Sequence, residues 1–133
     1  MSKNISLTLK NLELFSLDFK RTEATGEKSN FVTKSTLEIV EHTAEKVIIK
    51  NLRIFDMNNI EPFHLEFEVI GEFTGDNLTE KELKENLENI SYPLLSKSSY
   101  IGAFITEQYL GYPFISPPSV EDGEPDEEVK DQE

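Results

Sequence analysis

The spacing of the hydrophobic residues changes once along the chain, and this change restricts the possible folds more than any other feature. Up to about residue 74, apolar residues alternate with polar ones. Between residues 78 and 115 they recur at helical spacing. Alternation is typical of strands with one buried face, and spacings of three and four are typical of amphipathic helices. Strands that all precede the helices predict an α+β fold, with a four-stranded antiparallel sheet followed by a long helix packed on it.

Four strands are predicted, at residues 5–19, 31–42, 45–57 and 63–73. In the first, the apolar positions change phase between Leu9 and Leu12, which predicts a β-bulge. In the third, both faces are partly apolar. Because a small antiparallel sheet commonly leaves one face to water, a second apolar face indicates a surface for a partner.

The helical part of the chain carries clear start and stop signals. Thr79 and Glu82 match the capping box that begins a helix. Pro93 would remove a backbone hydrogen bond inside a helix, so a second helix is predicted to begin there. Gly111 is typical of the residue that ends a helix. The second helix is therefore predicted over residues 93–110.

This second helix is apolar on more than one side and is rich in small residues. A helix with that pattern is buried on more than one side. One side can lie on the sheet, and in a domain this small the other is expected to meet another subunit. The predicted oligomer interface consists of Leu94, Ser98, Ile101, Gly102 and Ile105.

A proline-rich loop with large apolar side chains follows the helix. Residues 112–118 read YPFISPP. Exposed apolar loops are costly unless they pack or bind something. Two interpretations stay open for Tyr112, Phe114 and Ile115. These side chains either bind a ligand or fold back on the sheet as part of the core.

Length and charge narrow the class of protein. The 133 residues suffice for one domain, predicted over residues 1–120. Residues 121–133 hold eight carboxylates and one lysine, which predicts a disordered acidic tail. The net charge of −13 and the scattered basic residues argue against nucleic acid as a partner. Cysteine is absent, and no apolar run suggests a signal peptide or membrane insertion, so a cytoplasmic protein is expected.

No pattern in the sequence indicates catalysis. Phosphate-binding loops, nucleophile elbows and zinc-protease motifs are absent. His42 and His64 lie among carboxylates on predicted strands, but their spacing matches no metal-ligand pattern. We interpret them as polar-face histidines and expect no enzymatic activity, no metal and no cofactor.

Two motifs flank the second predicted helix, residues 89–95, NISYPLL, and residues 111–118, GYPFISPP. Together with the helix between them, they resemble the SecB family of export chaperones. In that family an aromatic-proline pair opens a long helix rich in small residues, and a proline-punctuated crossover loop follows. Four strands also precede the helices there. The chain departs from the family after the loop, where an acidic tail takes the place of a further helix.

The resemblance implies a homotetramer, a dimer of dimers, with hydrophobic grooves that hold unfolded or precursor polypeptides without ATP. It places the groove at the crossover loop, and so at Tyr112, Phe114 and Ile115. It also implies the SecA motor as a partner. The nearest matches to the family's contacts with that motor are Glu13, Asp18, Glu66 and Glu68.

Three functions stay open at this point. An ATP-independent holding chaperone, with delivery of clients for protein export, fits best. The alternative is an adaptor domain on a SecB-like scaffold that binds one specific protein. A third is a binder of small apolar ligands in the same groove.

Overall fold

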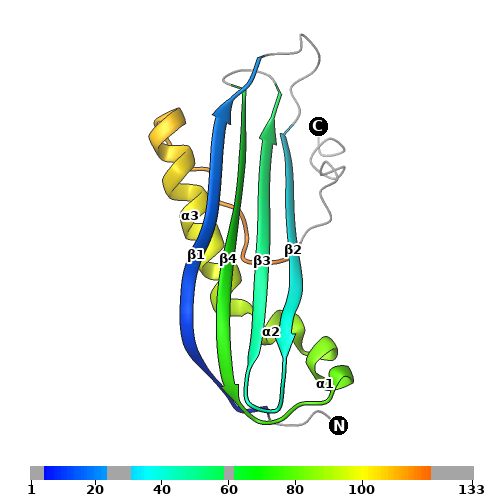
Figure 1. Cartoon of the computed structure of the whole chain (residues 1–133). Coiled ribbons are helices and arrows are strands. Elements are labelled where there is room, and N and C mark those ends of the chain that lie inside the picture. The colour runs from blue at the N-terminus through cyan, green and yellow to red at the C-terminus, as the bar shows by residue number, and fades with distance from the viewer. Residues whose placement is uncertain (1–4, 24–30, 59–61, 121–133) are drawn as a thin grey trace.

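The computed structural model describes residues 5–23, 31–58 and 62–120. Its elements are β1 (Leu7–Arg21), β2 (Phe31–His42), β3 (Val47–Met57), β4 (Phe63–Gly75), α1 (Glu80–Glu85), α2 (Leu87–Ile90) and α3 (Tyr92–Leu110). The strands form one antiparallel sheet in the order β1-β4-β3-β2, and α3 runs along one of its faces (Figure 1). The predicted fold class is confirmed.

The sheet has two unlike faces. The closed face looks toward α3 and carries the alternate apolar side chains of β3 and β4, which are almost completely buried. The open face carries the intervening residues of the same strands, such as Ile48, Lys50, Glu66 and Glu68, which are half-buried. The core therefore lies between the closed face and the helices.

β1 contains the predicted irregularity. Its pairing with β4 shifts register between Leu9 and Asn11 and again between Leu14 and Ser16. Leu9 pairs with Phe73, and Leu14, beyond the first shift, pairs with Val69. Since Phe73 and Val69 share one face of β4, the extra residue keeps the leucines on the closed face. The bulge predicted from the change of phase is confirmed.

The helix signals act as predicted, with one difference. Glu82 N–H donates to Thr79 Oγ1 at 3.1 Å, and Thr79 N–H donates to Glu82 Oε1 at 2.9 Å, which completes the capping box. Asn86 then separates α1 from α2, and its backbone N–H and its Nδ2 both donate to Glu82 O, at 3.2 and 2.8 Å. Pro93 lies in the first turn of α3, and Gly111 ends that helix with φ of 89°.

In the part of the chain that the structure describes, no helix has the length and apolar character that crossing a bilayer requires. The tail predicted at residues 121–133 lies outside the described residues.

Candidate functional site

The crossover loop, residues 111–120, is fixed to the fold through Phe114. Its N–H donates to Thr106 Oγ1 at 2.8 Å, and that hydroxyl donates to Gly102 O at 2.8 Å. The Phe114 ring packs edge-on against Phe31 and Phe55, with centroids 4.2 and 5.6 Å away. Phe114 is therefore anchored on both the helix and the closed face.

A second anchor is Ser116, a buried residue of the loop itself. The Nη1 group of Arg53, a fully buried β3 residue, donates to Ser116 Oγ at 2.7 Å. Its Nη2 group donates to Leu95 O of α3 at 3.5 Å. A buried charge is costly without hydrogen bonds, so these contacts tie strand, helix and loop together.

The remaining large side chains of the loop point away from the core. Tyr112 is 63% exposed and Ile115 is 75% exposed. Sequence reasoning left two interpretations for the loop, and the structure divides its residues between them. Phe114 packs with the core, while Tyr112 and Ile115 are presented to solvent on a loop that is held on either side.

The predicted interface residues of α3 lie mostly within the chain. Leu94, Ser98 and Gly102 are buried against the sheet, and Ile101 and Ile105 are half-buried against the core. A Cβ atom on Gly102 would lie 2.6 Å from the Phe55 ring. The small residues thus let the helix approach its own sheet, which the sequence did not distinguish from the approach of another subunit.

The outer side of α3 carries different residues. Tyr92, Tyr100 and Phe104 are 55%, 70% and 50% exposed. The rings of Tyr100 and Phe104 stack with centroids 6.4 Å apart. These aromatic side chains, with Tyr112 and Ile115, are among the large apolar side chains that the fold leaves exposed; the others include Leu14, Phe15, Leu17, Val40 and Val120.

A layer of buried polar groups joins α3 to the sheet, and sequence reasoning missed it. Ser98 Oγ donates to Asn51 Oδ1 at 2.5 Å, and Asn51 Nδ2 donates to Ser35 Oγ at 3.2 Å. Asn51 and Arg53 have the same strand parity as Ile49 and Phe55. The period-two pattern therefore already placed them on the closed face.

The four carboxylates predicted to contact a partner lie on the open face. Asp18 pairs with Glu66 across β1 and β4, Glu68 lies two residues along β4 on the same face, and Glu13 pairs with Ile70 of that face. Three of them already contact basic side chains of the chain. Asp18 lies 3.8 Å from Lys20, Glu66 lies 3.3 Å from His64, and Glu68 lies 3.1 Å from Lys50.

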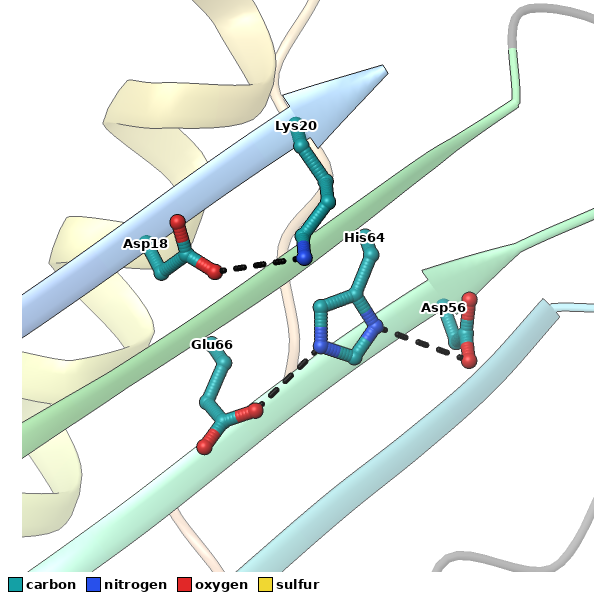
Figure 2. Close-up of polar contacts among 5 residues, drawn as sticks. All are labelled: Asp18, Lys20, Asp56, His64 and Glu66. Atoms are coloured by element: carbon teal, nitrogen blue, oxygen red, sulfur yellow. Dashed lines mark hydrogen bonds and ion pairs between the residues drawn. The ribbon is translucent and has the colours of Figure 1, made fainter. Parts of the chain in front are cut away.

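His64 stands between two of these acidic groups (Figure 2). Its Nδ1 lies 3.6 Å from Asp56 Oδ2, and its Nε2 lies 3.3 Å from Glu66 Oε1. The two ring nitrogens therefore face different carboxylates. Within residues 5–23, 31–58 and 62–120, no group of three acidic, histidine or cysteine residues could hold a metal ion.

Comparisons with known proteins identify the fold. No family model matches the chain, and no curated protein is similar to it in sequence. The SecB-like chaperone Rv1957 of Mycobacterium tuberculosis, solved with a ChAD peptide from the antitoxin HigA1, matches with a TM-score of 0.62 and 13% identity. That match covers 84% of this chain and 86% of the other.

A protein of unknown function from Streptococcus agalactiae matches with a TM-score of 0.55 and 14% identity, over 86% of this chain and 98% of the other. The order of the strands, the long helix and the loop after it agree with the resemblance seen in the sequence. The chain has a divergent SecB-like fold.

Proposed function

We propose that this chain is an ATP-independent holding chaperone, non-enzymatic and cytoplasmic, that binds unfolded polypeptides through its exposed apolar side chains. The observation that carries the proposal is the exposure of Tyr112 and Ile115 on a loop that Phe114 and Ser116 fix in place. The solved SecB-like chaperone with a bound peptide, which shares the fold, supports it.

The geometry suits weak and tolerant binding. A tyrosine ring offers a large contact area with few rotatable bonds, and an anchored loop loses little entropy when it binds. Each apolar contact covers only one or two client side chains. Several such contacts on one assembly add by avidity, so a long unfolded chain is held although no single contact is strong.

Charge adds a preference among clients. The chain carries a net charge of −13, and the open face is rich in carboxylates. Complementary charge raises the rate of association and disfavours acidic partners. Basic, apolar segments are therefore the preferred clients. A basic delivery partner such as the SecA motor would meet Glu13, Asp18, Glu66 and Glu68 on the open face.

The assembly that we propose is a homotetramer, a dimer of dimers. Because Leu94, Ser98 and Gly102 serve the chain's own core, the interface on α3 is assigned to Tyr92, Tyr100 and Phe104. A glutamate at Tyr100 should split the oligomer in sedimentation velocity. Glutamate at Lys81, an exposed position on α1 and so away from that face of α3, should not.

One observation favours a second candidate, an adaptor that binds one specific protein. The fold neighbour was solved with a peptide from a single partner, an antitoxin. Breadth of clients separates the two functions.

The experiment is a suppression assay with several unrelated, chemically denatured proteins. A holding chaperone lowers light scattering for most of them at stoichiometric amounts and without ATP. If none is protected, the holding function is wrong. If only one protein from a pull-down binds tightly, the adaptor function replaces the holding function.

A further inference from the structure

A pocket of about 390 Å³ lies at the end of the sheet opposite the loop anchors. Phe114 packs near the end where Phe31 pairs with Met57, whereas the pocket lies where Leu7 and Leu9 pair with Gly75 and Phe73. In Figure 1 this is the end at which β1 begins and β4 ends. The pocket is therefore separate from the candidate site on the loop.

The lining combines an apolar floor with a polar rim. Leu7, Leu9 and Ile90 are half-buried, and Phe73 beneath them is only 3% exposed. Two carboxamides, Asn86 and Asn89, complete the wall from the α2 side. Pockets of this size, with apolar walls and a few polar groups, are typical of ligand sites.

The two carboxamides suit a peptide backbone. Each offers an acceptor oxygen and amide donors, which is the complement of one peptide group. Nδ2 of Asn86 donates to Glu82 O, which fixes that side chain in the wall. Among the described residues that line the pocket none is cationic, so a neutral amide is a better match than an anionic head group.

The surroundings favour an extended, basic segment. β1 is an edge strand of the sheet, and among the residues that the structure describes no further strand pairs with its outer side. Glu85 and Glu88, each next to one of the asparagines in sequence, are exposed. Their charge complements lysine or arginine beside an apolar side chain.

We propose that this pocket is a second polypeptide subsite, which takes one large apolar side chain of an extended basic segment and pairs its backbone amide with Asn86 or Asn89. This inference rests on the proposed holding function. Two subsites at opposite ends of the sheet let one client contact the same chain twice, which strengthens binding through effective concentration.

The probe is a short fluorescein-labelled peptide with one central photo-leucine among lysines and serines. Binding is measured by anisotropy, and cross-linked positions are read by mass spectrometry. Asn89→Trp blocks the rim from an exposed position, and Lys81→Trp, at an exposed position of α1 outside the pocket lining, is the matched control. Burial of one large side chain corresponds to a loss of about tenfold or more for Asn89→Trp, against about twofold or less for Lys81→Trp.

The expected cross-links fall on residues of β1, β4 or α2 that line the pocket. Equal binding by both variants, or cross-links confined to residues 111–118, would overturn the subsite. So would a change of sedimentation in Asn89→Trp alone, which would make the pocket an interface between copies. A small molecule retained by the wild type and lost in Asn89→Trp would also overturn it.

The aggregation assay separates this failure from failure of the holding function. If the wild type protects denatured clients while Asn89→Trp binds the probe as well as the wild type does, only the second subsite is wrong. If the wild type protects no client and does not bind the probe, both proposals fail. Asn89→Ala removes the carboxamide without adding bulk, and its melting temperature should match that of the wild type. Weaker binding of the probe by this folded variant would then follow from the lost amide and not from unfolding.

Discussion

The two faces of the sheet are built from the same strands but differ in burial and in charge. On the closed face, Phe55, Phe63 and Phe67 are fully buried beneath α3 and the crossover loop. On the open face, aliphatic side chains such as Ile54 and Ile70 are half-buried among charged ones. The closed face holds the fold together, whereas on the open face charged side chains lie among the apolar ones.

The difference also separates folding residues from binding residues within one short segment. Phe114 and Ser116 complete the closed face, whereas Tyr112 and Ile115, on the same loop, add nothing to it. Substitutions on the loop should therefore divide into those that unfold the chain and those that leave its stability unchanged.

The largest expected effect is at Phe114. Phe114→Ala removes a half-buried ring packed against Phe31 and Phe55. Truncation of a fully buried phenylalanine costs about 3–5 kcal/mol, so a loss at the low end, about 3 kcal/mol, is expected. Urea denaturation should show this loss in the free energy of unfolding. Tyr112→Ala, at an exposed position, should change it by less than about 0.5 kcal/mol. Equal losses in the two variants would remove the distinction between anchor and exposed residues.

The next effect is at Gly102, where α3 approaches the sheet. Gly102→Val places methyl groups into the space held by the Phe55 ring, and overpacking of this kind costs about 1–3 kcal/mol. Gln108→Val, on an exposed turn of the same helix, is the control. Should Gly102→Val melt like the control, the close packing of helix on sheet is wrong.

A smaller loss is expected for Ser116→Ala. The change removes the oxygen that Arg53 Nη1 contacts at 2.7 Å. A hydrogen bond to a charged group contributes about 1.5–3 kcal/mol, and the low end is expected because Arg53 keeps its contact with Leu95 O. Ser119→Ala, three residues along the same loop, should be neutral. Thermal unfolding of both variants measures the difference, and a neutral Ser116→Ala would show that Arg53 does not hold the loop.

The smallest effect belongs to the open face and depends on pH. Hydrogen bonds to Glu68 and then Glu38 raise the pKa of Lys50 above its ordinary value of 10.5. The folded state therefore holds this proton more tightly than the unfolded state. Its contribution is complete below pH 10.5 and is lost as the pH rises through the folded pKa.

Melting temperatures on either side of pH 10.5 test this contribution. As the pH rises through this range, the melting temperature of Lys50→Met should fall less than that of the wild type. Lys84→Met, which breaks an exposed pair with Glu80, should behave like the wild type. A Lys50→Met profile that parallels the wild type would show that the ion pairs on the open face contribute nothing.

Local patterns predicted most of the fold because each depends on neighbouring residues. Period-two alternation placed the strands, the change of phase in β1 predicted its bulge, and Gly111 marked the end of α3. Asn86 was harder to foresee, since its side chain competes for a backbone carbonyl inside a segment with helical spacing.

Long-range contacts were beyond the sequence patterns. Nothing local distinguishes Gly102 packed on Phe55 from a glycine packed on a neighbouring subunit. Likewise, the loop motif does not show that Phe114 turns inward and Ile115 outward, because that division depends on Thr106 and Arg53. The roles of Tyr112, Phe114 and Ile115 in binding stay predictions.

The most direct measurement of the central claim is the affinity of a permanently unfolded client for the double variant Tyr112→Ser/Ile115→Ser. Exposed apolar side chains on an anchored loop predict a loss of about tenfold or more, because two apolar contacts are removed. The melting temperature and the sedimentation profile should remain those of the wild type. Unchanged affinity in a folded double variant would contradict the assignment of the crossover loop as the polypeptide-binding surface.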